Sequence, residues 1–369
     1  MSDLPPGWTE VVLGDICEFR YGKSLPAAKR SGSGYPVFGS NGQVGAHSTT
    51  VTKAPAIVIG RKGSFGEVHW SDQPCWPIDT TYFVDAAATD ADLRWLFHRL
   101  RCLGLTELNR AAAIPGLNRE DAYRKKLLLP PLEEQRRIAA ILDKADELRA
   151  KRLTSLEALR RLEESTFEEF MDSVADTTRA PLGSLVERVT VGHVGPTSEH
   201  FCEEGVPFLR TGNVGDGEIR WDDLRHVTFD FHKSLRKSEL HAGDVVVSRV
   251  ISDEVRAAVV PLELDGSNCA NVVIVRPGEL LTPHYLLGLI RHRTGQAALL
   301  RRRVGSAQSV VNTKVVQEWE IPVPSPAALE RLESELSRLR SIVVAGRSSL
   351  SGLDELRATL QARAFSGDL

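Results

Sequence analysis

Apolar residues recur in two kinds of pattern along this chain, and each kind occurs twice. Runs rich in β-branched residues, "APAIVIGRKG" at 54–63 and "AGDVVVSRVI" at 242–251, predict buried strands. Each run passes into an arginine, so each predicted strand leads into a basic loop. Helix-spaced apolar residues follow at 92–101 and at 284–293. The pattern therefore predicts the same order of elements in both halves of the chain.

Other stretches repeat in the same order, which indicates an internal duplication. "LGDICEF" at 13–19 is similar to "LGSLVER" at 182–188, and "YPVFGSNG" at 35–42 is similar to "VPFLRTGN" at 206–213. The ends of the halves keep one offset of 194 residues at three pairs of positions: Asn118 and Asn312, Pro130 and Pro324, Ile138 and Leu332. We therefore expect two related units, each ending in a short strand, prolines and a helix.

A long helix is predicted after each proline pair. The second has one heptad register, interrupted only by Gly346 and Arg357. Its a and d positions are Leu329, Leu336, Val343 and Leu350, and Leu332, Leu339, Leu353 and Leu360. The first, over 133–172, has a broader apolar stripe with Arg149 and Arg152 near its middle. One such stripe is typical of ordinary core packing, but two at matching places favour helices that pair with each other.

Together these patterns predict an α+β fold in which two globular units alternate with two long helices. The chain has 369 residues, with 42% hydrophobic and 26% charged residues, as in ordinary globular proteins. The five cysteines are scattered and never spaced as CxxC, so we expect neither a zinc site nor a disulfide framework. Neither a signal-peptide pattern nor a long apolar run occurs, so we expect a cytoplasmic protein without membrane contact.

The glycine-rich stretch "IGRKGSFGEV" at 59–68 raises the possibility of a nucleotide-using enzyme. A P-loop requires GxxxxGK[ST], and a dinucleotide fingerprint requires GxGxxG at the start of a helix; neither spacing is present. An Asn-Pro-Pro-aromatic or Asp-Pro-Pro-aromatic motif, which would hold a target base for methylation, is also missing from the sequence. We therefore expect no catalytic residues and interpret the stretch as a basic turn.

Local charge departs from the chain average in two segments. The whole chain has a net charge of −3, which gives no global attraction to nucleic acid. Between positions 94 and 126, however, eight Lys and Arg face three acids, and between 291 and 314 six Lys and Arg face none. A solvated helix face would explain one such segment. Two at equivalent places predict two anion-binding surfaces, for which DNA phosphates are the natural ligand.

Several polar residues on predicted loops are candidates for DNA contact, because Arg and Lys bind guanine or phosphate and Asn and Gln bind adenine. In the first half they are Asn41, Gln43, Arg61, Lys62, Ser64, Arg110 and Asn118. In the second half they are Arg210, Asn213, Arg249, Arg301, Arg302, Arg303, Gln308, Asn312 and Lys314. Phosphate contact or plain exposure is the commoner role for any one of them. For Asn118 and Asn312 the alternative is a turn or helix cap.

Four motifs resemble the specificity subunits of type I restriction-modification systems. The most diagnostic is "LLLPPLEEQRRIAAILDKADEL" at 127–148. It is supported by "PPGWTEVVLGDI" at 5–16, by the glycine-rich stretch, and by "LQARAFSGDL" at 360–369. The resemblance covers essentially the whole chain and agrees with the duplicated plan.

The resemblance implies a division into target recognition domains at 1–132 and 179–325, a central conserved helix at 133–178 and a distal one at 326–369. Each recognition domain would read half of a bipartite site in double-stranded DNA. The two helices would pair as an antiparallel coiled coil that sets the spacing between the half-sites. On this interpretation the chain is a subunit without catalysis of its own.

The resemblance also implies protein partners. Two copies of a methyltransferase subunit would dock on the chain, and two motor-nuclease subunits are an optional addition. S-adenosylmethionine and ATP would then belong to those partners, and this chain would hold no cofactor. The expected partner contacts are Glu133, Glu134, Gln135, Arg149 and Arg152, although the second helix lacks the Glu-Glu-Gln of the first. For Arg149 and Arg152, snorkelling is an equal alternative. A coiled-coil scaffold that reads no DNA is the competing interpretation of the whole chain.

Overall fold

The computed structural model describes residues 4–108, 116–251, 254–301 and 309–369. The chain divides into two compact units of mixed α and β structure. Unit 1 comprises residues 1–155 and 346–369, and unit 2 comprises residues 156–345. The boundary therefore falls within each long helix, whereas the sequence predicted boundaries at the helix ends.

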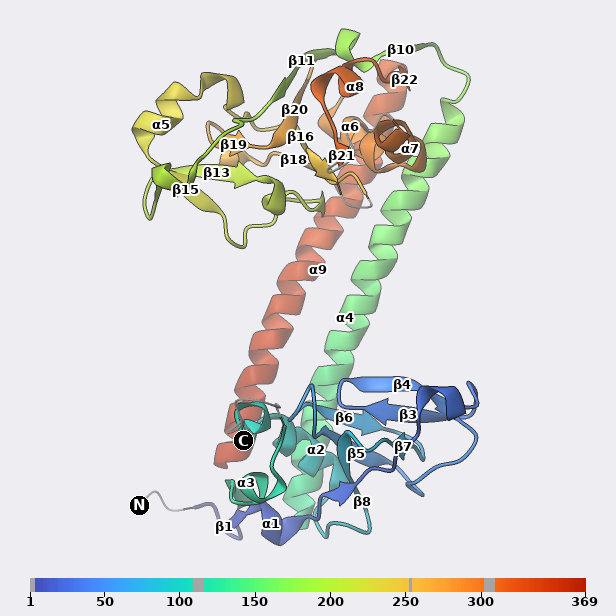
Figure 1. Ribbon diagram of the computed structural model, residues 1–369, viewed down its shortest axis with the longest axis vertical. Coiled ribbons are helices and arrows are strands. Elements are labelled where there is room, and N and C mark those ends of the chain that lie inside the picture. Colours follow the sequence, from blue (N-terminus) through green and yellow to red (C-terminus); the bar gives the residue numbers. More distant parts are fainter. Residues whose placement is uncertain (1–3, 109–115, 252–253, 302–308) are drawn as a thin grey trace. The chain divides into compact units, whose positions relative to one another are not determined.

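In unit 1 the main sheet is antiparallel, with the strand order β2-β8-β5-β6 (Figure 1). These strands are β2 (Arg20–Tyr21), β5 (Ala56–Gly60), β6 (Val68–Ser71) and β8 (Thr81–Asp85). Helix α2 (Leu93–Arg101) begins at Asp92, whose carboxylate accepts a hydrogen bond from the Trp95 amide, and it buries Trp95, Leu96 and Leu100 in the unit 1 core. The smaller sheet has the order β4-β3-β7, formed by β3 (Tyr35–Gly39), β4 (Gly42–His47) and β7 (Trp76–Pro77).

Unit 2 contains a longer sheet with the order β11-β20-β16-β18-β14. Its strands are β11 (Val186–Val191), β14 (Asp216–Gly217), β16 (Val245–Ser248), β18 (Ala257–Val259) and β20 (Val272–Pro277). Helices α6 (Pro283–Arg291) and α7 (Arg293–Arg301) follow, and α6 buries Tyr285 in the unit 2 core. The second sheet has the order β12-β15-β13-β19, from β12 (Phe201–Cys202), β13 (Val206–Arg210), β15 (Arg225–Val227) and β19 (Asn268–Ala270). Helix α5 is Phe229–Ser234, and β17 (Val250–Ile251) pairs with β21 (Ser309–Val310).

The two main sheets have the same topology. Taken in chain order, β2, β5, β6 and β8 correspond to β11, β16, β18 and β20, and the neighbours in each sheet are the same. The predicted strands at 54–63 and 242–251 are β5 and β16, and the predicted helices at 92–101 and 284–293 are α2 and α6. The predicted correspondence of 35–42 to 206–213 in the repeat is confirmed as well. Strand β3 has the parallel neighbour β7, and β13 has the parallel neighbour β19.

The ends of the two halves match most closely. Helix α3 (Arg119–Tyr123), strand β9 (Lys126–Leu129) and helix α4 (Leu132–Ser173) start 194 residues before α8 (Thr313–Gln317), β22 (Glu320–Pro322) and α9 (Pro326–Ser366). Strand β9 pairs with β1 (Thr9–Val12), just before α1 (Leu13–Ile16), and β22 pairs with β10 (Arg179–Pro181). The internal duplication predicted from the sequence is therefore confirmed by the order of elements.

Both predicted long helices are present, with 42 residues in α4 and 41 in α9 (Figure 1). In unit 1, Ile138 and Leu142 of α4 share a core with Ala364 and Phe365 of α9. In unit 2, Phe167 of α4 shares a core with Leu329, Leu332 and Leu336 of α9. Each unit is therefore completed by a segment of both helices.

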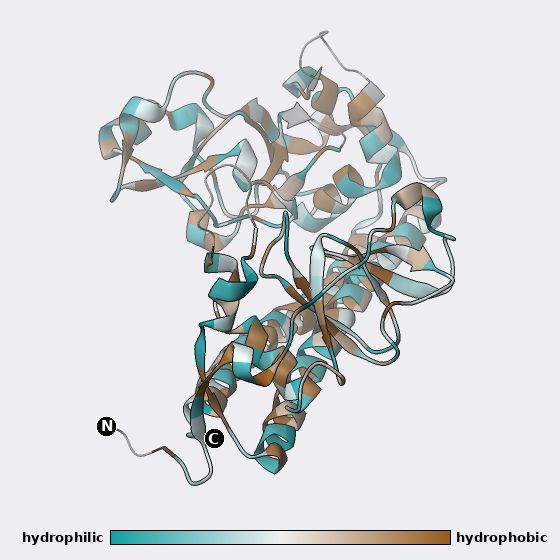
Figure 2. Cartoon of the chain, turned by 60° about the horizontal axis from the view of Figure 1, so that its bottom comes forward, coloured by the Kyte–Doolittle hydropathy of each residue, from teal (hydrophilic) through white to brown (hydrophobic). Residues whose placement is uncertain are grey.

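Hydropathy follows this arrangement. Figure 2 shows hydrophobic ribbon concentrated in the strands, while teal and brown residues alternate along the long helices. Within the ranges described above, no helix is long and apolar enough to cross a membrane.

Candidate nucleic-acid interface

The glycine-rich stretch forms a tight loop between β5 and β6. A Cβ at Gly60 would lie 2.0 Å from the carbonyl oxygen of Ser64, and Gly63 and Gly66 have φ values of +75° and +76°. A Cβ at Gly66 would also come within 2.5 Å of the backbone at Leu105. The glycines are thus required by the backbone path itself, since side chains there would clash or be strained.

A second loop, the turn between β3 and β4, is held against this one by the carbonyl oxygen of Thr80. That oxygen accepts hydrogen bonds from the Ser40 hydroxyl at 2.8 Å and from the amides of Arg61 at 2.9 Å and Lys62 at 3.1 Å. Asn41, which follows Ser40, is exposed, and so is Gln43. Residues that are 20 positions apart in the sequence are therefore neighbours.

The segment before α3 joins the same place. The Leu117 amide donates to the Arg61 carbonyl at 2.9 Å, and Lys62 and Gly116 form a β-bridge. Asn118 is the N-cap of α3, and its side-chain oxygen accepts from the Glu120 amide at 2.8 Å. The cap alternative for Asn118 is therefore confirmed, while a DNA contact by this residue stays a prediction.

Aromatic and cationic side chains meet on these loops. The Arg61 guanidinium donates to the Asp79 carbonyl at 2.7 Å and lies 5.2 Å from the ring centre of Tyr21. Arg119 lies 5.5 Å from the same ring, and the Tyr21 residue is 52% exposed. Burial raises the pKa of the adjacent Tyr82 to about 12, an effect to which Tyr21 adds and which Arg61 and Arg119 oppose, so this phenol stays neutral.

We call this set the unit 1 loop surface; its members are Tyr21, Asn41, Arg61, Lys62 and Arg119. Lys62 is exposed and Arg61 half-buried, with the Arg61 guanidinium held by its carbonyl and ring contacts. Cations over aromatic rings are oriented without an ion pair that neutralises them. The sequence did not single out Tyr21 or Arg119; the only available signal was that Arg119 follows Asn118 within a basic segment.

Unit 2 repeats two of the hydrogen bonds that hold this surface. The Thr211 hydroxyl donates to the Asn271 carbonyl at 2.6 Å, as Ser40 does to Thr80. The Val311 amide donates to the Arg249 carbonyl at 3.0 Å, as Leu117 does to Arg61. These contacts make Arg61 and Arg249 structurally equivalent, as the sequence repeat predicted.

Side chains on this frame form the unit 2 loop surface, composed of Arg210, Arg249, Asn312 and Lys314. Asn312 caps α8 by accepting from the Val315 amide at 2.9 Å, so the cap alternative is confirmed here too. Arg249 is half-buried, and exposed Lys314 lies 3.6 Å from Glu318. Arg210 donates to the Asp223 carboxylate at 2.7 Å, and this hydrogen bond lowers the pKa of Asp223.

One predicted base-reading residue is wrong. Asn213 is 2% exposed, and its amide group is fully occupied by the backbone. Its oxygen accepts from the Arg210 amide at 3.0 Å, and its nitrogen donates to the carbonyls of Arg220 and Asp222. Asn213 therefore shapes the loop that carries Arg210 and has no group left for a base.

The basic segments also need correction, because distant acids neutralise part of them. Arg94 donates to Asp143 at 2.7 Å and Arg101 to Asp146 at 2.9 Å, both on α4. In unit 2, Arg291 donates to Asp216 at 2.7 Å. These three arginines are therefore packed against carboxylates, so the net positive charge of both segments is smaller than the sequence indicates.

Other predicted residues lie elsewhere. Ser64 is half-buried in the tight loop. Four candidates, together with the side chain of Arg301, fall outside the described residues: Arg110, Arg302, Arg303 and Gln308.

The predicted partner contacts on α4 divide into three groups. Gln135 is 4% exposed; it accepts from the Asp92 amide and donates to the Pro130 carbonyl, both at 2.8 Å, so its assignment as a surface contact is wrong. Glu133 is exposed and Arg152 half-exposed, and both stay predictions. Glu134 is bonded to Arg137, which lowers the pKa of Glu134, and Arg149 donates to Asp354 of α9.

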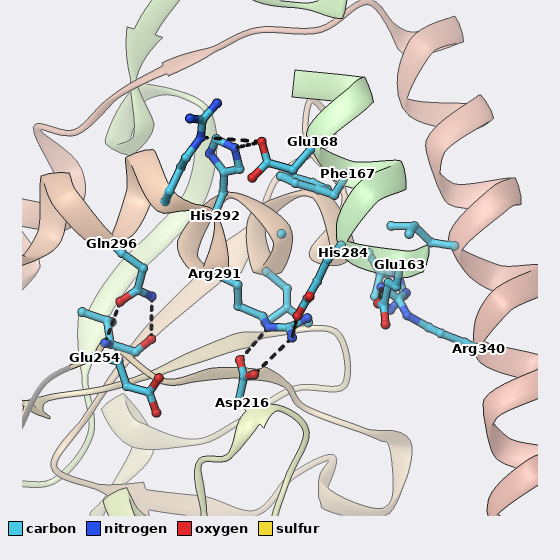
Figure 3. Close-up of a pocket in the computed structure, with 16 residues that line it drawn as sticks. Glu163, Phe167, Glu168, Asp216, Glu254, His284, Arg291, His292, Gln296 and Arg340 are labelled. Carbon is cyan, nitrogen blue, oxygen red and sulfur yellow. Dashed lines mark hydrogen bonds and ion pairs between the residues drawn. The ribbon is translucent and has the colours of Figure 1, made fainter. Parts of the chain in front are cut away.

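A cavity of about 310 Å³ opens in unit 2 between α4, α6 and α9 (Figure 3). Apolar side chains, among them Phe167 and Leu287, form part of its lining. Its lining includes a hydrogen bond between Glu168 and His292 at 3.0 Å and two ion pairs, Asp216 with Arg291 at 2.7 Å and Glu163 with Arg340 at 3.3 Å. These contacts connect α4 with His292, β14 with α6, and α4 with α9.

Comparison with known proteins agrees with this picture. Residues 5–158 match the family model described as Type I restriction modification DNA specificity domain. The MjaVIII type I restriction enzyme specificity subunit of Methanocaldococcus jannaschii is 25% identical over 271 residues, which is 67% of this chain and 63% of that protein. The EcoBI specificity subunit of Escherichia coli is 19% identical over 348 residues, which is 85% of this chain and 73% of that protein.

The fold is shared more completely than the sequence. The crystal structure of a type I restriction-modification system S subunit from M. genitalium has a TM-score of 0.65 at 14% identity, covering 99% of this chain and 97% of that one. The matched family domain, the relatives and the fold all confirm the predicted resemblance. In its matched domain and in its fold, the chain is therefore similar to the specificity subunits of type I restriction-modification systems.

Proposed function

We propose that this chain is the non-catalytic DNA-recognition subunit of a type I restriction-modification complex, in which each unit reads one half of a bipartite double-stranded target. One observation carries the proposal. Both units hold their loops with two hydrogen bonds at equivalent positions, one from a hydroxyl and one from a backbone amide, yet they place different side chains on these loops. A constant frame with variable side chains is what two readers of different sequences require.

The proposal assigns DNA contact to the two loop surfaces. Lys62 and Lys314 are suited to phosphate, since both are exposed amines on flexible stems. Arg61 and Arg249 occupy equivalent positions and are suited to base edges, where a guanidinium can bind guanine through two hydrogen bonds. Tyr21 supplies an exposed ring beside two guanidinium groups.

The proposal further takes α4 and α9 as an antiparallel coiled coil that spaces the half-sites. In unit 1, Asp146 of α4 contacts Arg357 of α9, and Arg149 contacts Asp354. The residue number therefore falls on α9 as it rises on α4, and the contact of Glu163 with Arg340 in unit 2 continues the same order. This order supports antiparallel pairing, and helix length then fixes the gap between half-sites.

Protein partners are proposed for the outer faces of these helices. Large apolar side chains are exposed there, between about two-fifths and two-thirds of their surface: Leu148, Leu153, Leu162, Ile342, Val344 and Leu356. Two methyltransferase subunits are the proposed occupants, with two motor-nuclease subunits as an optional addition. S-adenosylmethionine and ATP would be held by those subunits. Since DNA is the ligand, the proposal implies a cytoplasmic protein.

The test is electrophoretic DNA binding by the methyltransferase subunit with and without this chain, over a salt series. We expect sequence-specific binding only with the chain present, and affinity that falls steeply with salt. A complex with no gain in sequence preference over the methyltransferase alone would overturn DNA reading and favour a scaffold.

A further inference from the structure

The contacts between α4 and α9 include an ion pair that forms at repeat-equivalent positions in both units. The acid is on α4 and the base on α9 each time, so the residues at equivalent positions carry opposite charges. In unit 1, Asp146 of α4 accepts from Arg357 of α9. Adding 194 to position 146 gives Arg340, and subtracting it from 357 gives Glu163; these two residues form the ion pair of unit 2 at 3.3 Å. The duplication has kept the two positions in contact while acid and base changed places.

Both versions of the pair are partly withdrawn from solvent. The side chains are 27% and 21% exposed for Asp146 and Arg357, and 24% and 27% exposed for Glu163 and Arg340. Charges at such sites interact more strongly than fully exposed ones, because less water screens them. A mismatch here would therefore be felt in helix pairing.

In a second contact, only one of the two equivalent positions reverses its charge. Arg149 of α4 donates to Asp354 of α9 at 2.5 Å. The equivalent positions 194 residues away are Val343 on α9 and Arg160 on α4. Acidic residue 354 on α9 thus corresponds to a basic residue on α4.

The exchange has a consequence for pairing between like helices. If α4 met a second copy of α4 in the same register, Asp146 would face Glu163, and Arg149 would face Arg160. If α9 met a second α9, Arg340 would face Arg357. Opposite charges would then lie one turn away, about 5 Å along the axis, and would compensate only in part.

We propose that these charges select the helix partner, so that α4 accepts α9 and rejects a second copy of itself, and α9 does the same. The occupant of each helix face is therefore the other half of the same chain. Charged positions beside a helix seam set partner choice in this way, by repulsion as well as by attraction. The inference rests on the helix pairing proposed above, and it keeps two unlike reading units together.

The test uses the whole chain, folded first and then cut. A protease site is inserted between Ala175 and Asp176, which are exposed just after α4, so cleavage leaves both halves associated. Isotope-labelled and unlabelled cut protein are mixed, with urea raised until label exchanges. Native mass spectrometry then counts pairs of unlike and like halves.

We expect unlike pairs to dominate in the wild-type protein. The matched variant carries D146R and R357D together, which retains an ion pair between α4 and α9 but makes each like pairing attractive at that position. In the variant the ratio of like to unlike pairs should rise by about tenfold. Equal ratios in the two proteins, or abundant like pairs in the wild type, would overturn the inference.

Two further controls keep the outcome interpretable. Thermal unfolding of the uncut variant checks that it folds, and the single variant D146R, which places two arginines together, should be the less stable of the two. The exchange experiment is carried out without DNA. Loss of the DNA-reading proposal would leave its result unchanged, and failure of partner selection would leave DNA reading intact.

Discussion

The two units share the same order of strands and loops but have different residues at equivalent loop positions. Unit 1 has Gly60 at the end of β5, where no Cβ fits, whereas unit 2 has Ser248 at the equivalent end of β16. In unit 1, Arg61 lies between an exposed tyrosine ring and a carbonyl oxygen. The residues that follow the equivalent Arg249 include none of the glycines that follow Arg61. Two hydrogen bonds that hold the loops, one donated by Ser40 or Thr211 and one by Leu117 or Val311, are common to both. The frame is thus fixed by backbone groups, and the loops are free to vary.

The largest expected effect comes from imposing the residue of unit 2 on unit 1. Gly60→Ser would place its Cβ about 2 Å from a carbonyl oxygen, so the loop must move, and we expect the free energy of unfolding to fall by about 2–3 kcal/mol. Urea denaturation measures it. Gly212→Ala in unit 2, where a Cβ meets nothing within 4 Å, is the control and should change little. A stable Gly60→Ser protein would show that the frames are interchangeable.

The next prediction tests whether each unit contacts a different half of the DNA target. In the complex with the methyltransferase subunit, Arg61→Ala should weaken target binding by about 1–3 kcal/mol and relax one half-site, because a base contact is lost. Arg249→Ala should relax the other half-site. Binding to targets randomised in each half measures both. If the two variants relax the same half, the assignment of one unit to each half-site fails.

Lys62→Ala sharpens the same comparison within unit 1. Loss of a phosphate contact should weaken binding to all sequences alike and reduce the slope of log affinity against log salt by about 1. Lys53→Ala, which removes an exposed lysine outside the unit 1 loop surface, is the control. A sequence-dependent loss would instead make Lys62 a base reader.

The capping residues test whether the repeated ends are energetically equivalent. Asn118→Ala and Asn312→Ala each remove a side-chain oxygen that accepts a helix amide, so each should cost about 1 kcal/mol of stability. Urea denaturation gives both values. Unequal losses would show that one cap is supported by its surroundings.

The smallest effect concerns pH. Burial opposes ionisation of Asp146, but hydrogen bonds and charges from Arg357 and Arg101 outweigh it and hold its pKa below the ordinary value of 3.8. Folding therefore favours the carboxylate, and this stability is present above that pH and is lost as the pH falls through the lowered pKa. Asp146→Asn should cost at most about 1 kcal/mol at neutral pH and nothing in strong acid. Urea unfolding of both proteins across that pH range measures the difference in the free energy of unfolding. A difference that does not change with pH would indicate a packing effect of the substitution instead of a charge effect.

Local patterns predicted the local structure well. The runs at 54–63 and 242–251, the helix-spaced residues, the heptads and the offset of 194 all describe contacts within a strand, a helix or a repeat. The cap alternatives for Asn118 and Asn312 succeeded for the same reason, because a cap depends on the next few residues.

Predictions failed where distant residues decide the outcome. Arg94 and Arg101 look unneutralised in sequence, but Asp143 and Asp146 lie against them in the fold. Asn213 looks like a loop residue available to DNA, yet neighbouring backbone occupies its amide. Tyr21 comes from a two-residue strand, and only tertiary structure brings it to Arg61.

The way α9 completes unit 1 has a consequence for synthesis on the ribosome. Unit 2 is one continuous stretch, but the core of unit 1 includes Ala364 and Phe365. Domains generally fold in the order in which they emerge, beginning at the amino end. Here the unit that begins the chain can complete its core only after the second has been made, so the part of that core formed by Ala364 and Phe365 is missing throughout translation of the other.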